Sequence, residues 1–417
     1  MREAMILHKA RSVKEASRVL YTCTTAKKNS LLEAINDRLY DEIPNILRAN
    51  KKDLKNAKQN GLQKVLLDRL ALNEQRINQM VNGVKDVVSL SDPVGIIIEK
   101  RRRPNGLLIE KMRVPLGAVG IIYEARPNVT IDASVLCLKS GNAVLLRGGS
   151  EAIHTNKKLV EIIKKALQDV NLPTGCVEFI DTTDRKAVQL MLKQEKYLDV
   201  IIPRGSQKFI SFIQKNSTVP VIAHGEGNCH IYVDSSAHLG KAEEIVFNAK
   251  VQRPSVCNAA EKLLVHEKIA AKFLPNVVSR LRQAGVEIRG DKNVLSIIKD
   301  AAPAQDADWY KEYLDLIIAI KTVKNLDDAI WHINHYGSHH SDAIVTSSKI
   351  HGERFLREVD SAAVYVNAST RFTDGFEFGL GAEIGISTQK LHARGPMGLA
   401  ELTSTKFIVH GKGQIRK

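Results

Sequence analysis

The sequence predicts an α/β protein that consists of two doubly wound α/β domains and a small β arm. Three observations predict this fold: a helical N-terminal region, a hairpin signal at Asn105-Gly106, and two series of short apolar strands separated by helical segments. Alternating strands and helices are typical of parallel sheets that carry helices on both faces. The chain of 417 residues is also too long for one ordinary domain.

The N-terminal region, before Val94, is expected to be mostly helical. Asn73 is a suitable N-cap, and the apolar residues after it share one helical face: Ile77, Met80, Val81, Val84, Val87 and Val88. A similar stripe precedes Pro44 and consists of Leu31, Ile35, Leu39 and Ile43. Both stripes predict helices that bury one face.

A β arm is expected next along the chain. Apolar runs at Val94–Glu99 and Leu107–Glu110 flank the turn signal Pro104-Asn105-Gly106, which predicts a long hairpin. Uncovered strands of such a hairpin would leave unpaired backbone groups at their edges. We therefore expect the hairpin to pack against another subunit.

Two series of strands follow the arm. The first is expected at Ala118 to Ile122, Ala143 to Leu146, Val177 to Ile180 and Asp199 to Ile202, with helices that include Thr155 to Leu167 and Arg185 to Leu192. The second begins after Gly227, with strands at Ile231 to Val233, Leu263 to Val265, Leu316 to Ile320, Ala343 to Val345 and Ala363 to Val366. The pattern places the junction of the two α/β domains near Asp234.

Composition and charge exclude several classes of protein. The formal net charge is +15, but the basic residues are dispersed among acidic ones, and Arg101-Arg102-Arg103 is the only tight cluster. Without a nucleic-acid-binding motif, this charge indicates a field that attracts small anionic substrates, or only a solvated basic surface. No apolar run approaches the roughly 20 residues of a membrane span, so we expect a cytoplasmic protein that binds neither membrane nor nucleic acid.

Cys257 is the first candidate catalytic residue. It lies in a polar loop, Val251 to Ala260, between a probable helix and the apolar strand at Leu263. A thiolate presented by such a loop can attack carbonyl carbon while nearby backbone N–H groups stabilise the oxyanion. The alternative is a small buried hydrophobic residue. The other cysteines, Cys23, Cys137, Cys176 and Cys229, form no CxxC pair, which disfavours disulfides and zinc.

Two glycine turns are candidate phosphate sites. Arg147-Gly148-Gly149-Ser150 ends one strand, and its guanidinium could bind the 2′-phosphate that distinguishes NADP from NAD. Gly205-Ser206 ends another strand and opens the helix Gln207 to Lys215, whose N-terminal N–H groups could bind a pyrophosphate. Ordinary turns would have nearly the same sequences, so both interpretations stay open.

Several long motifs in order resemble the aldehyde dehydrogenase superfamily and, within it, the gamma-glutamyl phosphate reductase family. The resemblance covers nearly the whole chain. Its most specific segments are Val114 to Gly117, Glu124 to Val129, His224 to His230, Gln252 to Asn258, Phe378 to Thr388 and Arg394 to Leu399.

The resemblance implies three parts. Residues 1–95, 115–234 and about 371–395 would form a cofactor-binding domain for NADPH, and residues 235–370 a catalytic domain. Residues 96–114 and 396–417 would form an oligomerisation arm, in which a strand around Lys406 to Val409 joins the hairpin. A homo-oligomer, dimer or tetramer, is implied.

The resemblance also implies the chemistry. Cys257 would attack L-glutamyl 5-phosphate and expel phosphate, and NADPH would reduce the resulting thioester to L-glutamate 5-semialdehyde, the second step of proline biosynthesis. The Cys257 N–H and the Asn128 amide would hold the oxyanion, although Asn128 could instead cap a turn. A separate glutamate kinase would supply the acyl phosphate, with or without transient contact. A hydrolytic or CoA-acylating aldehyde dehydrogenase is the alternative.

The substrate side is less determined. Hydrolytic relatives place a Glu before a Gly-Gly pair to activate water, whereas here Glu226 lies between Gly225 and Gly227. Arg126, Arg253 and Arg371 lie in family-like motifs and are candidates, with Glu226, for binding the substrate; Arg253 could meet the leaving phosphate. His332, His335, His339 and His340 lack ligand partners at suitable spacing, and no metal is expected.

Overall fold

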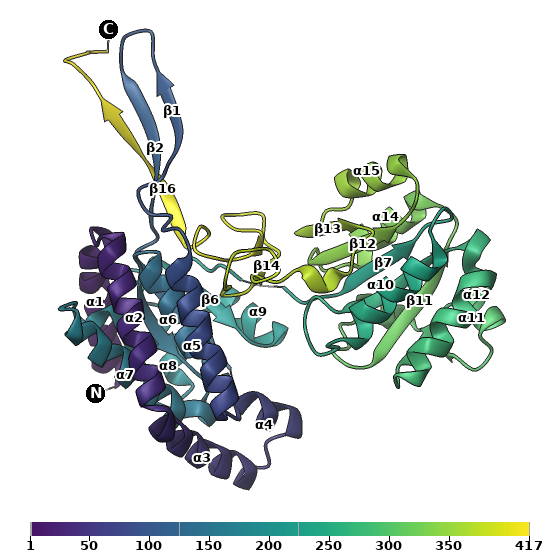
Figure 1. Ribbon diagram of the computed structural model, residues 1–417, viewed down its shortest axis with the longest axis horizontal. Helices are drawn as coiled ribbons and strands as arrows, with labels where there is room; N and C mark the ends of the chain where they lie inside the picture. Colours follow the sequence, from purple (N-terminus) through teal and green to yellow (C-terminus); the bar gives the residue numbers. More distant parts are fainter. Residues whose placement is uncertain (1, 125, 224, 417) are drawn as a thin grey trace. The chain divides into compact units, whose positions relative to one another are not determined.

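Two compact units make up the chain. The computed structural model describes residues 2–124, 126–223 and 225–416. Unit 1 comprises Met1–Ala223, Gly379–Gly385 and Met397–Lys417, and unit 2 comprises His224–Phe378 and Ile386–Pro396 (Figure 1). The first segment of unit 1 therefore ends at Ala223, earlier in the chain than the expected junction near Asp234. The reason is that the strand just before Asp234 pairs within the sheet of unit 2. The segment 371–395 was expected in the cofactor-binding domain, but all of it except Gly379–Gly385 belongs to unit 2.

The N-terminal region is helical, as expected. It contains α1 (Arg2–Tyr21), α2 (Thr25–Asp41), α3 (Ile43–Gln59), α4 (Lys64–Leu70) and α5 (Glu74–Ser89). Asn73 is the N-cap of α5, and its side chain accepts a hydrogen bond of 2.8 Å from the Arg76 N–H. The stripe that ends at Ile43 spans two helices, because Pro44 lies in the first turn of α3, where its missing N–H costs nothing.

The sheet of unit 1 is parallel and has the order β5-β4-β3-β6. It consists of β3 (Ala118–Tyr123), β4 (Ala143–Arg147), β5 (Val177–Phe179) and β6 (Val200–Arg204), which confirms the four predicted strands. The connecting helices are α6 (Asn128–Lys139), α7 (Ile153–Asp169) and α8 (Lys186–Met191), and α9 (Gln207–Asn216) follows β6. Strand order reverses between β3 and β6, and such a switch point is where open α/β sheets bind ligands.

The sheet of unit 2 is also parallel, in the order β10-β9-β11-β8-β7-β12-β13. The strands are β7 (Cys229–Val233), β8 (Ala260–His266), β9 (Glu287–Gly290), β10 (Ala302–Pro303), β11 (Ile317–Val323), β12 (Ser341–Val345) and β13 (Ala363–Val366). The helices are α10 (Leu239–Val251), α11 (Glu267–Gln283), α12 (Lys292–Ile297), α13 (Asp306–Tyr310), α14 (Leu326–Tyr336) and α15 (Lys349–Glu358). Both predicted doubly wound domains are therefore present.

Each face of the second sheet has its own apolar core. Leu263 packs with α10 and α11 on one face, and the next residue, Leu264, packs with α14 and α15 on the other. Because successive side chains of a strand point to opposite faces, both faces of β8 are buried, and its central residues Leu263 to Val265 are all apolar.

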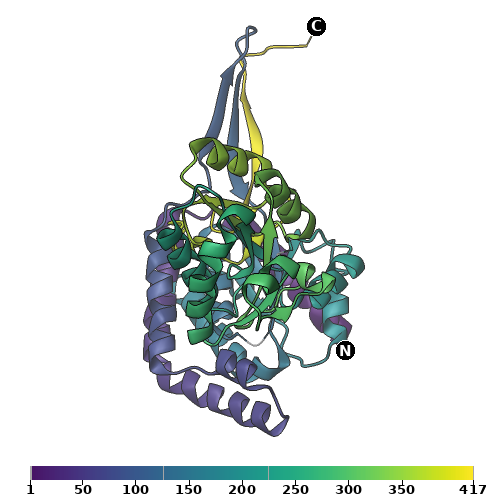
Figure 2. The same ribbon diagram turned by 90° about the vertical axis from the view of Figure 1, so that its right-hand side faces the viewer.

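The predicted arm is a three-stranded antiparallel sheet that extends from unit 1 (Figures 1 and 2). It contains β1 (Ile97–Arg102), β2 (Leu108–Pro115) and β16 (Thr403–His410). The C-terminal strand joins the hairpin as expected, with Lys406 opposite Met112 and Val409 opposite Ile109. In unit 2, β14 (Ile386–Ser387) pairs with β15 (Gly395–Pro396). None of the helices in the described chain is long and apolar enough to cross a membrane.

Candidate active site

Cys257 lies in the loop between α10 and β8, at the position that the sequence predicted. The residue is half-buried, and the loop ends at Ala259, whose N–H donates to the Val256 carbonyl at 3.1 Å. Strand β8 is buried along its whole length, so the loop starts and ends on rigid elements.

The backbone of Cys257 is held by the segment that contains Gly227. A Cβ atom at Gly227 would overlap the Cys257 carbonyl and would lie 2.6 Å from the Cys257 Cα. The Cys229 thiol, which is buried, donates to the same carbonyl at 3.1 Å. Gly227 is therefore required by close approach to the candidate nucleophile, which explains one glycine of the Gly-Glu-Gly motif.

A second segment, η3 (Thr370–Phe372), anchors the other side of the loop. The Asn258 side-chain amide donates to the Thr373 carbonyl at 2.8 Å, and the Thr370 hydroxyl donates to the Asn258 carbonyl at 2.7 Å. The Arg371 guanidinium donates to the Asn258 side-chain oxygen and, at 2.7 Å, to Gln252 Oε1. The structure thus brings Arg371 to the loop of Cys257.

The charges around the loop are mixed. Burial lowers the pKa of Arg371, and the neighbouring Arg253 lowers it further, while Asp374 and Cys257 act in the opposite direction. Arg253 is exposed. Two guanidinium groups beside a thiol make a suitable environment for an anionic group such as phosphate.

Two carboxyl groups also belong to this region. Burial raises the pKa of Glu226. Burial likewise raises the pKa of Glu312 to about 7, helped by the charges of Glu226 and Glu261 and opposed by a hydrogen bond from Gly227. That bond runs from the Gly227 N–H to Glu312 Oε1 over 2.7 Å. The sequence did not single out Glu312, since no motif spacing connects it to Gly227.

Unit 1 carries the residues predicted to bind the cofactor. Arg147 ends β4 and is buried, and it donates to the Gly148 carbonyl at 2.9 Å. Burial lowers the pKa of Arg147, opposed by the charge of Glu151 and helped by that of Arg185. A Cβ atom at Gly148 would overlap the Asn156 side chain, so this side chain packs directly against the Gly148 backbone. Ser150 is exposed and begins a 3-10 turn before α7.

Gly205 and Ser206 connect β6 to α9 at the switch point of the same sheet. A Cβ atom at Gly205 would lie 2.9 Å from the Glu124 carboxyl carbon, and the Ser206 N–H is 3.5 Å from Glu124 Oε1. The N-terminus of α9 has no side-chain cap. Its N–H groups therefore offer the donors that a phosphate needs.

Asn128 is the first residue of α6, in unit 1. Its side chain makes no cap and instead donates to Asp132 Oδ2 at 2.9 Å. Burial raises the pKa of Asp132 to about 6, while the bond from Asn128 and the charge of Arg204 act against this rise. Arg126 precedes the helix and is exposed. Unit 1 therefore carries Asn128 and Arg126, and unit 2 carries Cys257 and the other substrate-side candidates.

The histidines of α14 and the following loop pack against other groups. Burial, followed by the charge of His230, lowers the pKa of His332 to about 2, and the ring of His335 stacks on Trp331. His339 donates to the Asp360 carbonyl at 2.6 Å, and His340 Nδ1 lies 2.8 Å from the Ser341 hydroxyl. Within residues 2–124, 126–223 and 225–416, no group of three or more His, Cys, Asp or Glu side chains could hold a metal ion.

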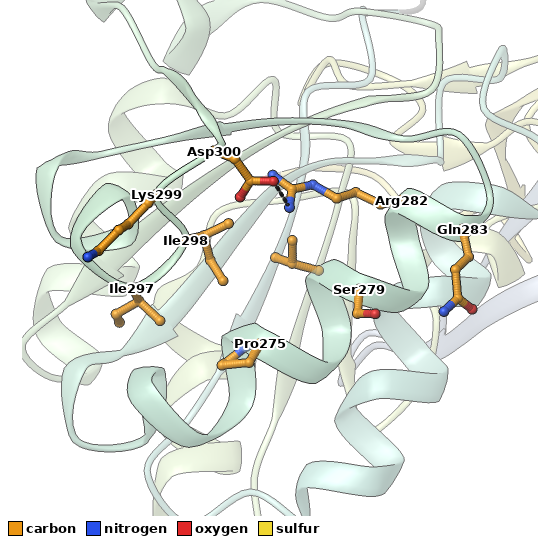
Figure 3. A pocket seen from close by; sticks show the side chains of 9 residues that line it. Pro275, Ser279, Arg282, Gln283, Ile297, Ile298, Lys299 and Asp300 are labelled. Atoms are coloured by element: carbon orange, nitrogen blue, oxygen red, sulfur yellow. Dashed lines mark ion pairs between the residues drawn. The ribbon is translucent and has the colours of Figure 1, made fainter.

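A hollow of about 650 Å³ lies between α11 and the end of α12 (Figure 3). Arg282 and Asp300 form an ion pair of 2.7 Å across it. Its lining consists of Pro275, Val278, Ser279, Arg282, Gln283, Ile297, Ile298, Lys299 and Asp300. It includes none of the predicted site residues.

Comparisons with known proteins give consistent matches. The model of the aldehyde dehydrogenase family matches residues 36–312. The chain is 55% identical over 411 residues to a gamma-glutamyl phosphate reductase of Clostridium botulinum (strain Alaska E43 / Type E3), and 56% identical over 412 residues to one of Halothermothrix orenii. Both matches cover 99% of each chain.

Solved structures agree with these matches. The crystal structure of a gamma-glutamyl phosphate reductase from Thermotoga maritima superposes with a TM-score of 0.97 at 52% identity, covering 99% of this chain and 100% of that one. An acetylating aldehyde dehydrogenase from Geobacillus thermoglucosidasius has a TM-score of 0.72 at 16% identity, covering 100% and 98%, which shows a shared fold.

Proposed function

Because the chain belongs to the aldehyde dehydrogenase family, and within it to the gamma-glutamyl phosphate reductase family, we propose that it reduces L-glutamyl 5-phosphate to L-glutamate 5-semialdehyde. This reaction releases phosphate and is the second step of proline biosynthesis from glutamate. The observation that carries the proposal is the loop of Cys257, which is held by Gly227 on one side and by η3 on the other, with two arginines beside it.

Cys257 is the nucleophile of the proposed reaction. Its thiolate attacks the acyl carbon, the carbonyl π electrons move to oxygen, and collapse of this oxyanion expels phosphate and leaves a thioester. The Cys257 N–H and the Asn128 amide are the proposed oxyanion donors. The hydrogen bond from the Asn128 amide to Asp132 supports this proposal, because it restricts the orientation of the amide.

The proposed cofactor is NADPH, which supplies, when bound, the hydride that converts the thioester to the thiohemiacetal. Residues of unit 1 fit this group: Nε of Arg147 is buried without a hydrogen-bond partner in the part of the chain that is described, and Gly148 and Gly149 follow it in a turn that has no room for side chains. Ser150, Gly205 and Ser206 would hold the phosphates. Collapse of the thiohemiacetal then frees the aldehyde and restores the Cys257 thiol.

The substrate groups are assigned by charge. Arg253 and Arg371 would bind the phosphate that leaves, because both guanidinium groups lie near the Cys257 loop. Arg126 would bind the α-carboxylate, and Glu226 the α-ammonium. In domain terms, unit 1 is the proposed cofactor-binding domain, unit 2 the catalytic domain, and the sheet β1-β2-β16 the oligomerisation arm.

A phosphate-dependence assay tests this function. Oxidation of L-glutamate 5-semialdehyde with NADP should require inorganic phosphate, and NAD should be used less well. Turnover that proceeds without phosphate, or only with coenzyme A, would reject the proposal in favour of a hydrolytic or acylating enzyme. Cys257→Ala should abolish turnover while the circular dichroism spectrum stays that of the parent.

A further inference from the structure

Glu312 connects to the candidate nucleophile through one glycine. Its carboxylate accepts the hydrogen bond of 2.7 Å from the Gly227 N–H, and Gly227 packs directly on the backbone of Cys257. We propose that Glu312 is a positioning residue: by holding Gly227, it sets the place of the Cys257 thiol for attack. The inference rests on the proposed function, because Cys257 is its nucleophile.

The contact between Gly227 and Cys257 leaves little room for movement. A Cβ atom added to Gly227 would overlap the Cys257 carbonyl, so the two backbones are already at their closest approach. The Cys229 thiol donates to that carbonyl, and the Cys229 N–H donates to the Gly227 carbonyl at 2.9 Å. A shift of Gly227 is therefore passed on to Cys257 by direct contact and through Cys229.

The neighbouring residue is anchored independently of Glu312. The Asn228 side chain donates to the carbonyls of Trp309 and Tyr336, each at 2.8 Å, and its N–H donates to the Ser338 hydroxyl at 2.8 Å. These three bonds attach the segment to unit 2. Removal of the Glu312 carboxylate is therefore expected to displace Gly227 locally without unfolding the domain.

The charges around Glu312 show what its role requires. Glu226 and Glu261 repel its carboxylate, whereas the hydrogen bond from Gly227 and the charge of His340 favour the ionised form. A side chain whose only task was to hold the N–H could do so as well with a neutral oxygen. The proposal therefore makes the accepted hydrogen bond, and not the negative charge, the essential feature, and glutamine should replace Glu312.

Two variants and one control test the proposal. In Glu312→Ala the acceptor is lost, whereas Glu312→Gln keeps a carbonyl oxygen at the same distance from the backbone. The control is Glu353→Ala, because Glu353 is exposed on α15. For each protein, the alkylation rate of Cys257 by iodoacetamide is followed by peptide mass spectrometry, kcat and KM are measured in the phosphate-dependent assay, and thermal melting reports folding.

The expected result is a split between the variants. Glu312→Ala should lower kcat at least ~10-fold with KM changed less than ~3-fold, and should slow alkylation of Cys257 at least ~5-fold. Glu312→Gln and Glu353→Ala should stay within ~3-fold of the parent in both rates. Parent-like rates in Glu312→Ala would overturn the proposal. So would equal losses in the alanine and glutamine variants, since the charge would then be the essential feature.

The alkylation rates distinguish a failure of this inference from a failure of the proposed function. If the parent shows no phosphate-dependent activity, the proposed function fails, and the alkylation rates alone still decide whether Glu312 positions Cys257. If Glu312→Ala does not fold, the glutamine variant decides: parent-like alkylation supports the role of the hydrogen bond, and slow alkylation of the folded glutamine variant rejects it.

Discussion

The backbone of Gly227 lies against the backbone of Cys257, so closely that no other residue fits at position 227 without movement. The two residues come from different segments: Gly227 precedes β7, and Cys257 precedes β8. Because β7 and β8 are neighbours in the sheet, the segments before them enter it side by side, which brings the glycine to the candidate nucleophile.

Gly227→Ala should therefore inactivate the enzyme. The new Cβ would overlap the Cys257 carbonyl and force the loop to move, and a displacement of about 1 Å at a reacting group costs on the order of 100-fold in rate. We expect kcat for the phosphate-dependent reaction to fall at least ~100-fold, while the substrate KM changes little. Steady-state kinetics on the purified variant measures both constants.

The matched control is Gly83→Ala in α5, where no atom lies within 4 Å of an added Cβ. Alanine is favoured over glycine in a helix by about 1 kcal/mol, so this variant should be slightly more stable and fully active. Full activity in Gly227→Ala would contradict the close contact between the two backbones.

Replacement of Arg371 should weaken the binding of phosphate. Arg371→Ala removes a guanidinium beside the loop and two of its hydrogen bonds, to Asn258 and Gln252. In oxidation of the semialdehyde, the KM for inorganic phosphate should rise at least ~10-fold, because a charge-assisted contact is worth about 1.5–3 kcal/mol. Initial rates at varied phosphate concentration give the KM.

Arg371→Lys and Arg357→Ala complete this experiment. Lysine keeps the positive charge but loses the planar guanidinium that can bind two oxygens at once. The KM for phosphate of Arg371→Lys should therefore lie between those of the parent and the alanine variant. Arg357 is an exposed residue of α15 that pairs with Glu358, and its loss should leave the KM unchanged. An unchanged KM in Arg371→Ala would assign the phosphate to another residue.

Much of the fold could be predicted from apolar periodicity. Strand β13 has the predicted bounds, and β3 and β4 each extend one residue beyond the prediction, because these strands are apolar runs between turn signals. Strand β9 was not predicted, since its four residues, Glu287–Gly290, include only one large apolar residue, Ile288, and four residues with one such side chain carry too weak a pattern. Its place in the sheet comes from pairing with β11.

The candidate site was predictable where local sequence specifies it. The loop position of Cys257 follows from the helix and strand on either side. The contacts that hold the loop come from distant segments, as in the bonds of Asn258 to Thr373 and of Gly227 to Glu312. Such partners are selected by tertiary packing and leave no spacing in the sequence, so only the structure identifies Glu312.

Glu312 should also give unit 2 a pH-dependent stability. Its pKa in the folded chain is about 7, above the ordinary 4.5, so between these values the folded state binds more protons than the unfolded state. Stability therefore declines as the pH rises from about 4.5 to 7, by about 3 kcal/mol at most, and then levels off. This loss is absent in Glu312→Gln, which does not titrate.

Melting temperatures of the parent and Glu312→Gln at pH 5, 6, 7 and 8 measure this effect. The difference in Tm, variant minus parent, should grow in favour of glutamine up to about pH 7 and stay constant above it. The variant Glu353→Gln, on the exposed surface of α15, should show no such trend. A difference that is constant over the whole range would mean that Glu312 keeps an ordinary pKa.

The arm should carry the contact between subunits. Its outer strands are β1 and β16, and apolar side chains on them are exposed: Ile97 by 40%, Phe407 by 66% and Val409 by 54%. Exposed apolar residues on strand edges favour pairing with another chain. The double variant Phe407→Lys with Val409→Lys places charge there and removes apolar surface whose full burial is worth about 1.5–3 kcal/mol per residue.

Size-exclusion chromatography with light scattering should show a smaller assembly for this double variant than for the parent at the same concentration. The control is Ile350→Lys, because Ile350 is 73% exposed on α15, which belongs to unit 2, whereas the arm belongs to unit 1. Its mass should equal that of the parent. If the arm variant has the mass of the parent while Ile350→Lys has a smaller mass, the subunit contact lies on unit 2. The exposed edges of β1 and β16 would then not form the contact between subunits.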